Sequence, residues 1–216
     1  MSDQQSVEAA WRLLAAWLKA NAPVSYASLL PRAPEPAIET ADAALRQRLG
    51  FPLPAELAVL WRICGGVEHQ ELERDEEGEV GSGAFLPGGV ILSPVDALRP
   101  RLPDHTGTDW WGGAPVVPWL TGDEAGSESG HWVGDHGVGR WSLDSLIGVG
   151  QKVAYPSIAA YLNTVYRTLT DGPADAMSPA VPGVVWGCLI WERHEAPLLD
   201  EALRHWAPVH QVTTTI

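Results

Sequence analysis

The chain begins with three helical patterns in its first 66 residues, and this run of helices constrains its fold most. Apolar residues recur at the three- and four-residue spacing of an amphipathic helix in three segments, residues 6–20, 36–49 and 54–64. Proline stands in the first turn of the second and third segments, and Gly50 and Gly65 follow their ends. The sequence therefore predicts three helices, with a proline-rich connection over residues 22–35.

The pattern changes after residue 66. Short apolar stretches now alternate with Gly and Pro, which is typical of strands joined by turns. The expected strands are residues 84–86, 90–92, 116–120, 131–133 and 139–143, with a short helical turn at residues 94–99. Helices followed by strands, without regular alternation, predict an α+β fold rather than a doubly wound α/β fold.

The last third of the chain predicts one long helix and a separate extension. Residues 155–169 return to the helical period, and Pro156 suits the first turn. Residues 171–182 are typical of a linker, and beyond them we expect a strand at residues 184–191 and a short helix at residues 197–206. The predicted domain, residues 1–172, has N-terminal helices packed on a central, mostly antiparallel sheet and a closing helix. Residues 173–216 form a C-terminal strand-helix extension, which we expect to dock on the same domain because residues 184–191 are too apolar to stay exposed.

Net charge restricts the kinds of partner. The chain has 27 Asp and Glu against 14 Lys and Arg, a net charge of −13 that is spread over both halves. Nucleic acids and anionic membranes are bound by basic surfaces, so neither is an expected partner. Acidity favours solubility, or association with a basic protein. No secretion signal and no long apolar segment is recognisable, which predicts a cytoplasmic protein.

One acidic run is dense enough to suggest a binding face. Seven carboxylates accompany a single Arg74 between residues 68 and 79: Glu68, Glu71, Glu73, Asp75, Glu76, Glu77 and Glu79. Such a run is typical of a solvated loop or of the tip of a hairpin. The alternative is one face that binds a cationic partner, with fast association that weakens as salt rises.

Tryptophan is unusually abundant, with eleven in the chain. Most are expected to be large core anchors, because they lie on the apolar side of their segments. Trp110 and Trp111 are an exception, since neighbours in sequence rarely point into the same core. We therefore expect this pair to contribute anchors to a partner-binding surface.

Sequence motifs of catalysis are missing. The chain contains no phosphate-binding loop, dinucleotide-binding, zinc-protease or nucleophile-elbow motif, so we expect a protein that is not an enzyme and uses no cofactor. The best metal candidates are Asp123, His131, Asp135 and His136, which would suit zinc, but a polar turn explains them as well. Cys64 and Cys188 lie in apolar surroundings and are expected to be buried free thiols.

Three passages resemble the SUKH superfamily, in the branch of the yeast cell-wall assembly regulators and bacterial immunity proteins. They are the Leu-Gly-Phe-Pro-Leu-Pro link and helix in residues 49–66, the strands in residues 116–139, and the Tyr-Pro-Ser-Ile-Ala-Ala-Tyr-Leu start of the closing helix, residues 155–162. The likeness covers residues 7–172. It departs from the family at Arg46, where an acidic residue is frequent, and at Gly65, where the family usually has Asn.

The resemblance implies a function in binding rather than catalysis. The family is known mainly for proteins that bind and neutralise partner proteins, notably polymorphic toxins. We therefore expect an immunity protein that binds a cognate, basic toxin domain. Two alternatives stay open: a regulatory or scaffold protein that binds an endogenous partner, and a metal-dependent enzyme that uses the candidate metal ligands.

Overall fold

A computed structural model describes residues 3–74, 78–98, 115–122, 129–142, 152–172, 180–193 and 201–210. The three predicted N-terminal helices are confirmed as α1 (Asp3–Asn21), α3 (Glu35–Leu49) and α4 (Ala55–Ile63). Gly50 ends α3 in the left-handed conformation, at φ 77°. The predicted connection also holds a short helix, α2 (Pro23–Ala27), with proline in its first turn.

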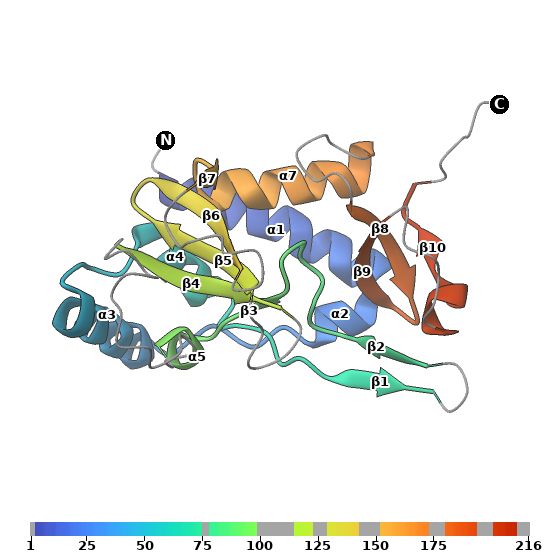
Figure 1. Cartoon of the computed structure of the whole chain (residues 1–216), viewed down its shortest axis with the longest axis horizontal. Helices are drawn as coiled ribbons and strands as arrows, with labels where there is room; N and C mark the ends of the chain where they lie inside the picture. Colours follow the sequence, from blue (N-terminus) through green and yellow to red (C-terminus); the bar gives the residue numbers. More distant parts are fainter. Residues whose placement is uncertain are drawn as a thin grey trace.

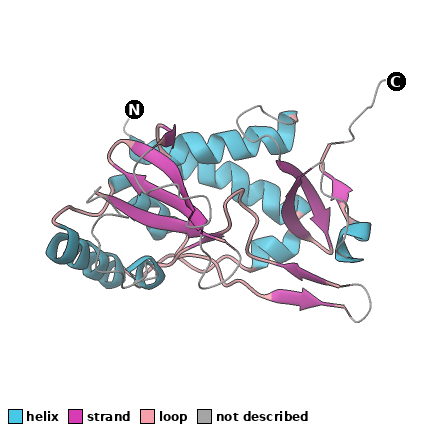
Figure 2. Ribbon diagram, viewed as in Figure 1, coloured by secondary structure: helices cyan, strands magenta, loops and turns pink. Residues whose placement is uncertain are grey.

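The central sheet has five antiparallel strands in the order β3-β4-β5-β6-β7 (Figure 1). The strands are β3 (Val90–Ile91), β4 (Val116–Thr121), β5 (Ser129–Gly134), β6 (Gly137–Ser142) and β7 (Val153–Tyr155). The helical turn α5 (Pro94–Leu98) follows β3, as predicted. The predicted strand at residues 84–86 is wrong, because Leu86 makes only an isolated bridge with Gly89 across a tight turn. Helices and antiparallel sheets together confirm the α+β class (Figure 2).

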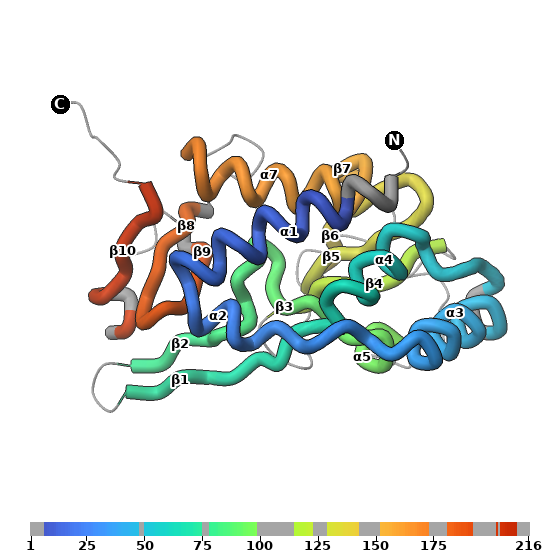
Figure 3. Tube along the Cα trace, turned by 180° about the vertical axis from the view of Figure 1, so that it is seen from behind, coloured from blue at the N-terminus to red at the C-terminus, as the bar shows by residue number. Residues whose placement is uncertain are grey.

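The closing helix α7 (Ile158–Asp171) starts three residues later than predicted. Tyr155 is the last residue of β7, so the apolar pattern of residues 155–169 runs across a strand end and a helix. The helix starts where it does because the Ser157 hydroxyl caps it, accepting a hydrogen bond from the Ala160 N–H at 3.0 Å. Seen from behind, α7 runs alongside α1 (Figure 3).

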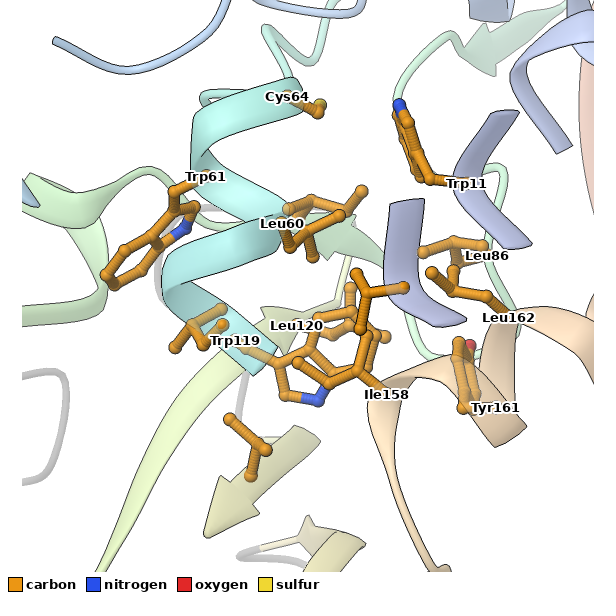
Figure 4. Packing of buried hydrophobic residues seen from close by; sticks show 14 of the residues in the cluster. Trp11, Leu60, Trp61, Cys64, Leu86, Trp119, Leu120, Ile158, Tyr161 and Leu162 are labelled. Carbon is orange, nitrogen blue, oxygen red and sulfur yellow. The ribbon is translucent and has the colours of Figure 1, made fainter. Parts of the chain in front are cut away.

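The main core lies where the helices meet one face of the central sheet. Trp119 of β4 packs edge-to-face on Tyr161 of α7, with ring centroids 5.4 Å apart. Leu60 and Trp61 of α4 reach the same region (Figure 4), and the Trp61 indole N–H donates to the Leu92 carbonyl at 2.9 Å. All nine tryptophans in the described part of the chain are buried or half-buried, which confirms that most of them are core anchors.

The C-terminal part forms a three-stranded sheet in the order β10-β8-β9. Its elements are β8 (Ala180–Val185), β9 (Cys188–Arg193), a 3₁₀ helix η3 (Glu201–His205) and β10 (Ala207–Pro208). The single strand predicted at residues 184–191 is wrong, because the chain reverses at Trp186 and Gly187. The predicted linker at residues 171–182 is also misplaced, since α7 ends at residue 171 and β8 already begins at residue 180. Within the predicted helix at residues 197–206, residues 201–205 form η3, and residues 197–200 lie outside the described part.

The C-terminal hairpin packs directly on the main core. Leu189 is fully buried there, and its N–H donates to the Ser25 hydroxyl of α2 at 3.0 Å. The indole N–H of Trp191 donates to the Phe85 carbonyl at 2.8 Å. Among the helices that the structure describes, none combines the length and apolar character required to cross a membrane.

Candidate partner-binding surface

The acidic run folds into a hairpin, as one of the two sequence interpretations predicted. Strands β1 (Glu71–Glu73) and β2 (Glu79–Gly81) pair antiparallel, and the hairpin projects from the body of the molecule (Figure 1). Asp75, Glu76 and Glu77 lie outside the described residues. Glu68, Glu71, Glu73 and Glu79 are all described, and all four side chains are exposed.

The two faces of this hairpin differ in chemistry, because successive side chains of a strand point to opposite faces. Glu71, Glu73 and Glu79 point to solvent on one face, which is called the acidic face below. Leu72 and Val80, which are paired across the strands, point to the other face and are covered. The acidic pattern therefore presents charge outward while the hairpin keeps an apolar side toward the protein.

Like charges stand opposite each other on the acidic face. Glu73 and Glu79 are direct cross-strand partners, an arrangement that destabilises a strand pair. Within the described part of the chain, the ion pairs are Arg46–Asp42 and Arg62–Glu35, and none involves the acidic face. Glu71, Glu73 and Glu79 thus form no ion pair with another described residue.

The base of the hairpin is fixed by hydrogen bonds to its neighbours. The Glu68 N–H donates to the Ser28 carbonyl at 2.9 Å, and the Gln70 N–H donates to the Ser82 hydroxyl at 3.1 Å. The Gly83 N–H donates to Nδ1 of His69 at 3.3 Å. These contacts set the point from which the acidic face leaves the body.

Two residues that the sequence pattern did not single out meet behind the acidic face. The guanidinium carbon of Arg74, at the end of β1, lies 4.8 Å from the ring centroid of Trp186, in the β8–β9 turn. The only signal in the sequence was that Arg74 is the single cation of the acidic run. Trp110 and Trp111, the expected aromatic anchors, lie outside the described residues.

The three metal candidates that the structure describes do not come together. His131 is only 2% exposed and packs against Tyr161 of α7, with ring centroids 5.4 Å apart. Asp135 and His136, four and five residues after His131, lie exposed in the turn between β5 and β6. Asp123 is outside the described part. Among the described residues, no group of three or more His, Cys, Asp or Glu side chains is placed to hold a metal ion.

His131 is instead a neutral core residue. Its Nε2 accepts a hydrogen bond from the Arg140 side chain at 3.3 Å, and its Nδ1 is buried without a described partner. Burial, reinforced by the positive charge of Arg140, lowers the pKa of His131 to about 3. An uncharged imidazole is therefore built into the contact between β5 and α7.

Both cysteines are buried free thiols, as predicted. Burial raises the pKa of each thiol to about 11, which keeps it protonated and unreactive near neutral pH. Cys64 donates weakly to the Gly66 carbonyl, with the sulfur 3.2 Å from the oxygen.

Comparisons with known proteins add no assignment. The sequence matches no protein-family model, and no curated protein matches it either.

Proposed function

We propose that this chain is a protein-binding module related to the SUKH superfamily, acting as an immunity protein that neutralises a basic toxin domain in the cytoplasm. The observation that carries the proposal is the acidic face of the β1–β2 hairpin. Its three exposed carboxylates share one side, and two of them oppose each other directly. The family resemblance of residues 7–172 supports the same class of function.

Electrostatics explains how such a face works. Arg or Lys side chains of a partner, placed between Glu73 and Glu79, relieve the repulsion that the free hairpin carries. The long-range field of a protein with a net charge of −13 accelerates the encounter, and salt screens it. Neutralisation then requires occlusion of the toxin and no chemistry by this chain.

The test is affinity co-purification from the native host, at low and at high salt, with mass spectrometry. We expect one basic partner in near-stoichiometric amount, weakened at high salt. The triple variant Glu71→Gln, Glu73→Gln and Glu79→Gln should lose this partner. The matched control is Glu8→Gln, Glu39→Gln and Asp135→Asn, which changes the net charge equally at exposed positions away from the hairpin.

The outcomes of these experiments distinguish the proposal from its alternatives. Equal loss in both triple variants would show that overall charge, and not the acidic face, attracts the partner. Full retention in the hairpin variant would remove this face from the proposal. An endogenous partner without toxic activity would favour the regulatory alternative. Stoichiometric zinc in protein purified without a histidine tag would favour the metal-dependent alternative.

A further inference from the structure

A small apolar cluster lies between the acidic hairpin and the C-terminal sheet. Its buried members are Val80 of β2, Val185 and Cys188 of the β8–β9 hairpin, and Ala202 of η3. Leu72 of β1 packs against it from the same side as Val80. The two hairpins lie at the same end of the molecule (Figures 1 and 3), so the C-terminal sheet backs the acidic hairpin.

A cation–π contact joins the two hairpins near the tip of the acidic one. The Arg74 guanidinium lies over the Trp186 ring, and the Arg74 N–H donates to the Gly78 carbonyl at 3.0 Å. Arg74 therefore stands directly after β1, opposite the residue that precedes β2. The positive charge of the run is directed toward the C-terminal sheet, and the carboxylates of Glu71, Glu73 and Glu79 are directed to solvent.

Trp186 occupies a backbone conformation that tryptophan normally avoids. Its φ is 49°, and among the described non-glycine residues it alone has a positive φ. The two-residue turn between β8 and β9 requires left-handed residues, for which Asn and Gly are the usual choices. The indole ring contacts two side chains: the Arg74 guanidinium carbon lies 4.8 Å from its centroid, and the His205 ring centroid lies 5.8 Å away.

We infer that Trp186 is a positioning residue, which clamps the β1–β2 hairpin through Arg74 and the cluster beneath it and so fixes the direction of the acidic face. The importance of this clamp for partner binding rests on the proposed function, whereas the clamp itself is a property of the free protein. The C-terminal extension then has a defined role. It keeps the acidic face in one orientation before a basic partner binds.

Hydrogen exchange of the full-length free protein, followed by mass spectrometry, tests the clamp. Trp186→Asn keeps a residue suited to the turn and removes the indole. We expect exchange in residues 68–82 to accelerate about tenfold or more, while α7 and strands β4–β6 keep their rates. Arg74→Gln should accelerate the same segment about two- to fivefold, the size expected from an exposed cation–π contact. Trp186→Tyr keeps an aromatic ring and should therefore retain most of the wild-type protection of residues 68–82. Arg12→Gln, which removes an exposed arginine on α1, is the matched control.

Wild-type exchange rates in residues 68–82 of Trp186→Asn would overturn the inference. Uniform acceleration of every segment would overturn it too, because Trp186 would then contribute only to global stability. If Trp186→Asn does not fold, Arg74→Gln decides alone. No partner is present in this experiment, so its failure is distinguishable from the absence of a basic partner in co-purification.

Discussion

The side-chain carboxylate of Glu56 accepts a hydrogen bond from the backbone N–H of Ile158 at 2.6 Å. This bond joins the first turn of α4 to the first turn of α7, across 102 positions of the sequence. Both Glu56 and Ser157 thus cap α7: Glu56 does so from the distant helix α4, and Ser157 does so from the position just before α7.

Replacing Glu56 tests the long-range cap. Glu56→Gln keeps an acceptor oxygen but removes the negative charge from a helix N-terminus, so we expect the free energy of unfolding to fall by about 0.5–1 kcal/mol. Glu56→Ala should cost about 1–2 kcal/mol, because the Ile158 N–H then loses its partner. Urea denaturation gives both values. Glu39→Gln, exposed on α3, is the control, and equal effects in Glu39→Gln and Glu56→Gln would refute the cap.

The buried His131 predicts a dependence of stability on pH. The folded pKa is about 3, below the ordinary value near 6.5, so the unfolded chain binds a proton first as the pH falls. The stability that neutral His131 contributes is fully present above about pH 6.5 and is lost as the pH falls toward 3. Between these values the free energy of unfolding falls with a slope that approaches about 1.4 kcal/mol per pH unit. Denaturation between pH 7 and pH 5 should show this decline before most carboxylates titrate.

The decline should be weaker in His131→Gln, whatever the absolute stability of that variant. His136→Gln, in the exposed turn after β5, should keep the wild-type slope because His131 is still present. Parallel profiles for the wild type and His131→Gln would show that His131 is not buried uncharged.

The repulsion on the acidic face predicts a gain of stability when it is removed. Glu73→Gln should raise the free energy of unfolding by about 0.2–1 kcal/mol at low salt, since Glu79 then faces a neutral partner. The gain should shrink in high salt, where the charges are already screened. Thermal denaturation at two salt concentrations measures it, and a loss of stability at low salt would mean that Glu73 makes a favourable contact. A gain in stability with a loss of partner would show that the charge is kept for binding.

Thiol reactivity tests the burial of the cysteines. With Ellman's reagent at pH 8 we expect no rapid reaction of the folded protein and two reactive thiols in denaturant, since both thiols are buried and protonated. Trp186→Asn should make Cys188 react faster, because its cluster opens, while Cys64 stays protected in the main core. The additional replacement Cys188→Ala identifies the reacting thiol. A fast reaction of the wild-type protein would contradict the buried cluster.

Local patterns along the chain were enough to predict the long helices, the buried thiols and the acidic hairpin. A helical stripe, a proline in the first turn and a glycine after the end are local signals, and they act wherever the segment finally packs. The same holds for the acidic run, because a dense row of carboxylates is strongly solvated in any context. These features were predictable because their energies depend on neighbours along the chain.

Three features depend on contacts between distant segments: the turn at Trp186, the cap that Glu56 provides for α7, and the residues behind the acidic face. Tryptophan is no turn signal, so residues 184–191 looked like one continuous strand. The contacts that favour the turn come from Arg74 and His205, which are distant in sequence. His131 likewise resembled a metal ligand because of its neighbours in the sequence. In the folded protein it is a core residue that packs against Tyr161. Each of these outcomes depends on contacts between distant segments, and their free energies exist only once the chain has folded.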